Sequence, residues 1–167
     1  MDKIRIFIVD DHKIFRDGIK SLLEKIKTIE ISGEAANANQ ALAHPALQET
    51  HVILMDIDMG GSDGIQATQI ITVKYPGIRV LALSMHLEDN YVIDMLEAGA
   101  RGYLVKNAGK DEMIAAIQAV YKGDTYFSNE VSDVLIRQIH GGRESKQRNL
   151  RQDEIPITKR EIEILRL

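Results

Sequence analysis

The chain of 167 residues contains no cysteine, and this absence excludes two kinds of site. Without thiols there is neither a disulfide framework nor a thiolate metal centre. Long hydrophobic runs are also missing, since no stretch approaches the roughly 20 apolar residues that a membrane span needs. The N-terminal apolar core is short and runs straight into Asp10 and Asp11, which is not the pattern of a signal peptide. We therefore expect a soluble, cytoplasmic protein with no membrane contact.

The charge of the chain is moderate and uneven. Charged residues make up 28% of the sequence and the formal net charge is -4, which is typical of a globular protein. The segment 137–151 is locally basic: it carries Arg137, Arg143, Lys146, Arg148 and Arg151 against the single acid Glu144. A basic stretch of this kind is most often a solvated linker.

Five apolar segments rich in β-branched residues alternate with segments of helical periodicity. The predicted strands are 4–9, 29–35, 52–56, 78–84 and 101–105. The predicted helices are 12–26, an alanine-rich helix shortened or kinked by Pro45, 63–74, 89–98 and 111–122, with Gly99 and Gly123 as natural ends. This alternation requires right-handed crossovers and predicts an α/β fold, a doubly wound five-stranded parallel sheet covered on both faces.

Polar side chains stand at the ends of four predicted strands. They are Asp10 and Asp11, Asp56, Ser84 and Lys106. In a parallel sheet the carboxyl ends of the strands meet at one edge, where ligands bind. One acidic residue at a strand end has an ordinary structural interpretation, whereas this combination at four ends predicts a shared site.

The chemistry of such a cluster is restrictive. Three neighbouring carboxylates repel one another unless a cation lies between them, and oxygen ligands favour Mg²⁺ over zinc. Because Mg²⁺ commonly accepts a phosphate oxygen, the predicted ligand is a phosphoryl group. Asp56 would be the nucleophile that forms an acyl phosphate, and Lys106 and Ser84 would stabilise the phosphoryl oxygens.

These residues lie in motifs that resemble a response-regulator receiver domain: IVDD at 8–11, MDIDM at 55–59, LALS at 81–84 and GYLVK at 102–106. The resemblance covers about residues 4–122. It implies a flavodoxin-like, CheY-like fold whose Asp56 is phosphorylated by a sensor histidine kinase. The protein would be a phosphoacceptor and no enzyme in the usual sense.

The resemblance also implies roles for single residues. Mg²⁺ would bind Asp11, Asp56 and the backbone carbonyl of Asp58, with Asp10 assisting through water. Ser84 and Tyr103 would form the switch pair. Asp58 and His86 would flank the entry to the acyl phosphate and tune the lifetime of the signal; each also has the ordinary interpretation of an exposed side chain. The residues that the resemblance implies at the metal site are thus Asp10, Asp11, Asp56 and Asp58. Those that it implies in the catalytic chemistry of phosphorylation are Asp56, Lys106 and Ser84.

Three motifs together resemble regulators of the NarL/FixJ type: SMH at 84–86, AGARGYLVKN at 98–107 and ITKREIEILRL at 157–167. Thr158 and Glu161 form a capping box, and ITKREIEILRL at 157–167 is similar to the opening of a LuxR-type helix-turn-helix. We predict a receiver domain at 1–125, a helical and flexible linker at 126–153, and a truncated DNA-binding domain at 154–167. Within the linker, a helix is expected at 128–140, and Gly141 and Gly142 should open a polar segment. Phosphorylation would cause homodimerisation, and the full-length protein would bind DNA although this fragment would not.

Two alternatives remain open. Asp56-Ile57-Asp58 imitates the nucleophile–acid pair of Mg²⁺-dependent phosphatases of the haloacid dehalogenase kind, but Gly60 does not fit that motif and no segment is long enough for a cap domain. The other alternative is a stand-alone receiver that acts as an interaction module without DNA output. The capping box at Thr158 argues against it.

Overall fold

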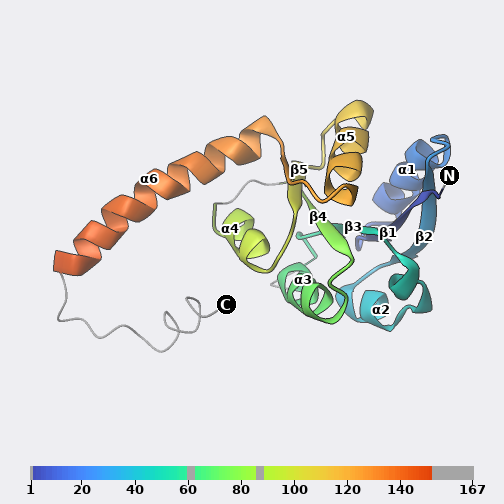
Figure 1. The fold of residues 1–167 in the computed structure, drawn as a ribbon, viewed down its shortest axis with the longest axis horizontal. Helices are drawn as coiled ribbons and strands as arrows, with labels where there is room; N and C mark the ends of the chain where they lie inside the picture. Colours follow the sequence, from blue (N-terminus) through green and yellow to red (C-terminus); the bar gives the residue numbers. More distant parts are fainter. Residues whose placement is uncertain (1, 60–62, 86–88, 152–167) are drawn as a thin grey trace.

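The computed structural model describes residues 2–59, 63–85 and 89–151, and its order of elements is the predicted alternation (Figure 1). The strands are β1 (Ile4–Val9), β2 (Ile29–Ala35), β3 (Val52–Asp56), β4 (Arg79–Ser84), β5 (Gly102–Val105) and β6 (Tyr126–Phe127). The helices are α1 (Lys13–Glu24), α2 (Ala38–Ala43), α3 (Asp63–Lys74), α4 (Asp89–Glu97), α5 (Lys110–Tyr121) and α6 (Asn129–Arg151), with a 3₁₀ helix, η1, at Pro45–Glu49. As predicted, α2 is short and ends before Pro45.

All strand pairs are parallel, and the order across the sheet is β2-β1-β3-β4-β5-β6. The central strand β3 pairs with both β1 and β4, so its end lies between theirs. This order is the doubly wound arrangement in which ligands bind at the carboxyl edge. The fold class predicted from the sequence is therefore confirmed.

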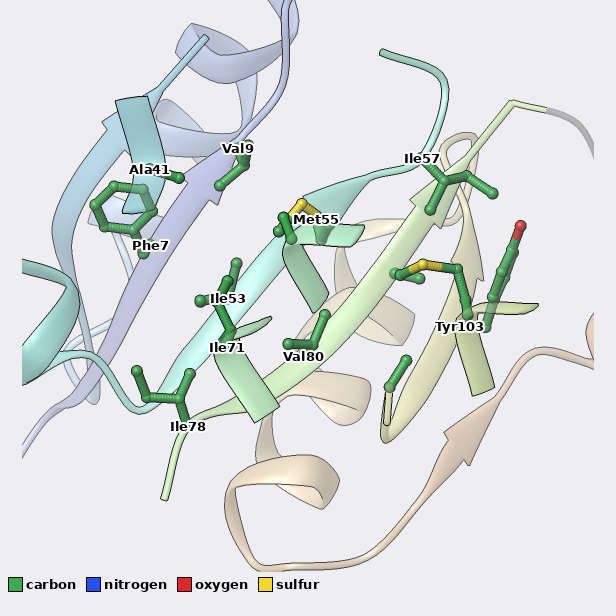
Figure 2. Packing of buried hydrophobic residues seen from close by; sticks show 14 of the residues in the cluster. Phe7, Val9, Ala41, Ile53, Met55, Ile57, Ile71, Ile78, Val80 and Tyr103 are labelled. Carbon is green, nitrogen blue, oxygen red and sulfur yellow. The ribbon is translucent and has the colours of Figure 1, made fainter. Parts of the chain in front are cut away.

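The hydrophobic core has two halves, one on each face of the sheet. Alternate side chains of β1 point to opposite faces: Phe7 and Val9 join one half, and Ile6 and Ile8 join the other. The first half lies beneath α2, α3, α4 and the first turns of α6, and the second lies beneath α1 and α5 (Figure 1). Figure 2 shows the first half, which contains Tyr103 of β5 together with aliphatic residues of β1, β3 and β4. Because both faces are covered, the sheet is rigid enough to fix the side chains at its edge.

The sheet has one strand more than the sequence predicted. The additional strand, β6, contains two residues and pairs with the start of β5, Gly102 with Tyr126 and Tyr103 with Phe127. A strand of two residues has no periodicity of its own, so only this pairing defines it. The five-stranded prediction is corrected to six.

The last helix also differs from the prediction. Gly141 and Gly142 were expected to end it, but α6 continues through both glycines to Arg151. Each glycine costs a helix about 1 kcal/mol relative to alanine, and the good helix formers among residues 143–151 can offset that cost. The first turns of α6 contact α4, β5 and β6, and they bury Val131 and Val134 in the core. The predicted DNA-binding segment at 154–167 lies outside the described residues.

Within the part of the chain that the structure describes, none of the helices has both the length and the apolar composition needed to cross a bilayer.

Candidate functional site

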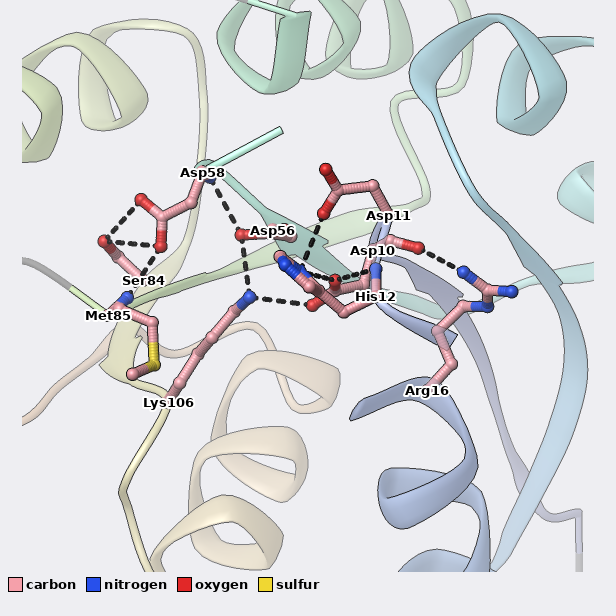
Figure 3. A network of polar contacts seen from close by, with 9 residues as sticks. All are labelled: Asp10, Asp11, His12, Arg16, Asp56, Asp58, Ser84, Met85 and Lys106. Carbon is pink, nitrogen blue, oxygen red and sulfur yellow. Dashed lines mark hydrogen bonds and ion pairs between the residues drawn. The ribbon is translucent and has the colours of Figure 1, made fainter. Parts of the chain in front are cut away.

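The strand ends bring the predicted side chains together at the carboxyl edge of the sheet (Figure 3). Asp56 and Ser84 are the last residues of β3 and β4, while Asp10 and Lys106 directly follow β1 and β5. These four residues are buried, and Asp56 and Ser84 have no exposed surface. Burial of four polar residues at one edge is unusual unless they hold one another or a ligand.

Lys106 is the cation of the cluster. Its Nζ lies 2.8 Å from Oδ2 of Asp10 and 3.1 Å from Oδ1 of Asp56, so one ammonium bridges two carboxylates. The ammonium also lies 4.6 Å from the centre of the Phe15 ring, a favourable cation–π position. Burial opposes the charge on Lys106, but the two carboxylates outweigh it and raise the Lys106 pKa above its ordinary value. Lys106 is therefore charged whenever the site works near neutral pH.

Asp56 has one oxygen engaged and one open. Its Oδ1 accepts the backbone N–H of Asp58 at 2.8 Å and pairs with Lys106. Its Oδ2 is buried and has no hydrogen-bond partner among the described residues. Burial raises the pKa of Asp56 from 3.8 to about 6, an effect that the Asp58 N–H and Lys106 oppose and Asp10 reinforces. Asp56 is thus ionised at neutral pH, with one oxygen ready for a new bond.

The acidic group has the donor set that a small divalent cation requires. Asp10, Asp11, His12 and Asp56 each place one ligand atom within 4.8 Å of the others, and three of the four offer oxygen. Nδ1 of His12 lies 2.8 Å from a carboxylate oxygen of Asp11 and 3.2 Å from one of Asp10. Carboxylate oxygens around a partly exposed position suit Mg²⁺, which keeps several waters. The residues present therefore fit the predicted metal.

The structure also shows contacts that the sequence did not predict. His12 was expected only as the start of a helix, but its backbone N–H donates to Oδ1 of Asp10 at 2.8 Å. Arg16 donates from Nη1 to the backbone carbonyl of Asp10 at 2.6 Å. The backbone N–H of Met85 donates to Oδ2 of Asp58 at 2.8 Å. The place of His12 directly after Asp11 is the one sequence signal that could have indicated its part in the site. The other contacts each involve a backbone group, so the residue types do not predict them.

Ser84 and Asp58 contact each other directly. The Ser84 hydroxyl donates to the Asp58 carboxylate, with 3.2 Å to Oδ1 and 3.5 Å to Oδ2. Tyr103, the other predicted switch residue, is completely buried in β5. His86, predicted to flank the entry, lies outside the described residues. The roles given to these residues stay predictions.

A doubly wound parallel sheet with a buried aspartate at the end of its central strand, acids after β1 and a lysine after β5 defines the class of the molecule. A family model described as the response regulator receiver domain matches residues 6–118. The match covers more than half of the chain, and the chain belongs to this family.

Relatives and solved structures agree with this membership. The chain is 33% identical over 176 residues to the transcriptional regulatory protein DegU of Brevibacillus brevis, covering 99% of this chain and 75% of that protein. It is 36% identical over 133 residues to the response regulator GacA of Pseudomonas protegens, covering 80% of this chain and 62% of that protein. The chain thus spans part of the length of each relative.

Among solved structures, the fold matches a two-component response regulator of the LuxR family from Aurantimonas sp. with a TM-score of 0.75 and 30% identity, covering 82% of this chain and 98% of that one. The receiver domain of the response regulator NarL from Mycobacterium tuberculosis matches with a TM-score of 0.69 and 32% identity, covering 74% of this chain and 99% of that one. The resemblance to NarL-type regulators is confirmed, and nothing in these matches supports the haloacid dehalogenase alternative.

Proposed function

We propose that the protein is a phosphorylation-activated response regulator in which Asp56 receives a phosphoryl group from a sensor histidine kinase. The observation that carries the proposal is how the two carboxylate oxygens of Asp56 are held. Its Oδ1 is fixed by the Asp58 N–H and Lys106, while its buried Oδ2 lacks a hydrogen-bond partner among the described residues. A carboxylate held in this way is oriented for attack and has a cation beside it to offset the charge that arrives.

The transfer would proceed by attack of an Asp56 carboxylate oxygen on the phosphorus of a phosphohistidine. The new O–P bond forms as the P–N bond breaks, and the electron pair of that bond returns to the imidazole nitrogen of the kinase, which then takes up a proton. Lys106 lies 3.1 Å from Oδ1 of Asp56 and compensates negative charge. The protein itself is the acceptor, so no turnover of a separate substrate is required.

The proposed cofactor is Mg²⁺, held by Asp11, Asp56 and the backbone carbonyl of Asp58, with Asp10 reached through water. When bound, the ion neutralises the carboxylates and coordinates a phosphoryl oxygen. Asp11 is the most exposed of these acids, with 46% of its side chain accessible, and one of its oxygens lies within 4.8 Å of an Asp56 oxygen. The chain's own contribution is to hold the acids close together against their mutual repulsion, which Lys106 partly offsets.

The proposed output is control of transcription. DegU carries the name of a transcriptional regulatory protein and aligns with nearly the whole chain, and the Aurantimonas structure is assigned to the LuxR family. In this proposal phosphorylation changes the positions of the Ser84 and Tyr103 side chains. That change promotes homodimerisation and releases a C-terminal DNA-binding domain in the full-length, cytoplasmic protein. The capping box at Thr158 supports the start of that domain.

The proposal is tested by treating the protein with acetyl phosphate and Mg²⁺ and measuring intact mass together with size by gel filtration. One phosphoryl group per chain and a shift toward a dimer are expected, and both should require Mg²⁺. Asp56→Asn is the matched control because it keeps the shape of the side chain and removes the nucleophile. Full labelling of the Asn variant would refute the assignment.

A further inference from the structure

The side chain of Asp58 binds the two hydrogen-bond donors at the end of β4. Its carboxylate accepts the Ser84 hydroxyl and the Met85 backbone N–H, the latter at 2.8 Å (Figure 3). The backbone N–H of the same residue donates to Oδ1 of Asp56 at 2.8 Å. One residue thus contacts the proposed phosphoacceptor through its backbone and the neighbouring strand end through its side chain.

The two donors have the properties of an anion site. A hydroxyl and an amide N–H converge on a carboxylate at the carboxyl edge of the sheet, next to Asp56. A phosphoryl group on Asp56 would bring three strong acceptor oxygens and nearly two negative charges to the same edge. Lys106 approaches Asp56 from the side of Asp10, and among the residues that the structure describes Ser84 and Met85 place donors on the other side (Figure 3).

We propose that the Asp58 carboxylate is a built-in competitor of the phosphoryl group, because it occupies Ser84 and Met85 in the unphosphorylated protein. This inference rests on the proposed function of Asp56. Asp58 would be a positioning residue: it holds both donors in place before phosphorylation and must release them when the phosphoryl group arrives.

Two physical effects of Asp58 act in the same direction. Its carboxylate takes hydrogen bonds that a phosphoryl group could accept, and its negative charge repels an incoming anion. Asp10, Asp11 and Asp56 already supply three carboxylates against Lys106, so a fourth acid increases that repulsion. Loss of one charge-assisted hydrogen bond changes an equilibrium by roughly tenfold or more. A purely structural role, in which Asp58 only closes the turn after β3, predicts no such competition.

The test measures binding of beryllofluoride, an anionic mimic of the phosphoryl group, to the whole chain at saturating Mg²⁺. Saturation removes any effect of Asp58 on metal affinity. Asp58→Ala should bind the mimic about tenfold or more tightly than the wild type, and Asp58→Asn should also bind more tightly because its amide is a weaker, uncharged acceptor. Asp124→Asn, which removes an exposed acid after α5, is the matched control and should leave the affinity unchanged.

A second readout needs neither metal nor mimic. In Mg²⁺-free protein, the Met85 amide proton in a ¹⁵N-correlated NMR spectrum should lie downfield in the wild type, and it should move upfield in both Asp58 variants. Asp124→Asn should leave it in place. This signature reports the hydrogen bond itself, and Asp58→Asn keeps the test valid if the alanine variant folds poorly.

The outcomes separate the two proposals. Binding of beryllofluoride by the wild type, with equal or weaker binding by the Asp58 variants, would overturn the competitor role and leave the proposed function standing. A Met85 resonance that does not move in the variants would overturn it as well. If neither the wild type nor the variants bind the mimic, the proposed function fails and the competitor role fails with it.

Discussion

Replacement of Asp56 by asparagine should stabilise the folded protein at neutral pH, although it destroys the proposed phosphoacceptor. Burial raises the pKa of Asp56 from 3.8 to about 6, so the ionised carboxylate is less favourable in the folded state than in the unfolded chain. A rise of that size corresponds to about 3 kcal/mol, at 1.36 kcal/mol per pKa unit. Asparagine has nearly the same shape and no charge to desolvate.

The dependence on pH follows from the direction of the shift. Because the folded pKa lies above the unfolded one, the destabilisation by Asp56 is absent below about pH 4, grows as the pH rises toward 6 and is complete above it. The asparagine variant loses one partner of Lys106, while Asp10 at 2.8 Å remains. We therefore expect a net gain of about 1–3 kcal/mol at pH 7.5 and a gain that vanishes near pH 4.

The assay is urea unfolding followed by circular dichroism in buffer without Mg²⁺, at several pH values between 4 and 8. Asp124→Asn removes an equal charge at an exposed position and should show no comparable gain. An Asp56→Asn variant that is no more stable than the wild type at pH 7.5, or whose advantage does not change with pH, would refute the reasoning about burial.

Three further predictions concern the metal, the start of α3 and the last helix. Mg²⁺ affinity, measured by calorimetry, should fall about tenfold per pH unit below pH 6, because Asp56 must lose its proton to bind the ion; a flat profile would contradict this. Gly64→Ala should cost about 1–3 kcal/mol in urea unfolding, since a Cβ there would lie 2.8 Å from the Asp56 carbonyl oxygen, whereas Gly77→Ala, in open space, is the control. Val134→Ala should cost about 2 kcal/mol and speed hydrogen exchange in α6, while unchanged exchange would show that α6 does not need this contact.

Most of the fold could be predicted because its strands have strong local signals. β1, β2, β3 and α3 have the predicted bounds, and the other main elements apart from α6 differ by one or two residues at their ends. Gly99 and Gly123 take positive φ just after α4 and α5, as their predicted place at helix ends requires. β6 could not be predicted because its two residues are defined only by pairing with β5. The continuation of α6 through Gly141 and Gly142 was missed because a glycine pair is only a weak helix breaker.

The sequence predicts which residues lie at the site, but it does not predict the detailed contacts among them. Parallel topology alone brings Asp10, Asp56, Ser84 and Lys106 to one edge, and the structure places them there. That Lys106 bridges Asp10 and Asp56 depends on side-chain geometry across two strands. The contact of Asp58 with the Met85 N–H involves a backbone group, which carries no signal in the sequence.

The central claim is that Asp56 carries the phosphoryl group, and chemical trapping of the acyl phosphate tests it most directly. Protein treated with acetyl phosphate and Mg²⁺ is reduced with borohydride, which converts an aspartyl phosphate to homoserine, and the modified residue is located by peptide mass spectrometry. We predict homoserine at position 56 alone, dependent on Mg²⁺ and undiminished in Asp124→Asn. Homoserine at another aspartate, or none at position 56 in protein that has gained a phosphoryl group, would contradict the account.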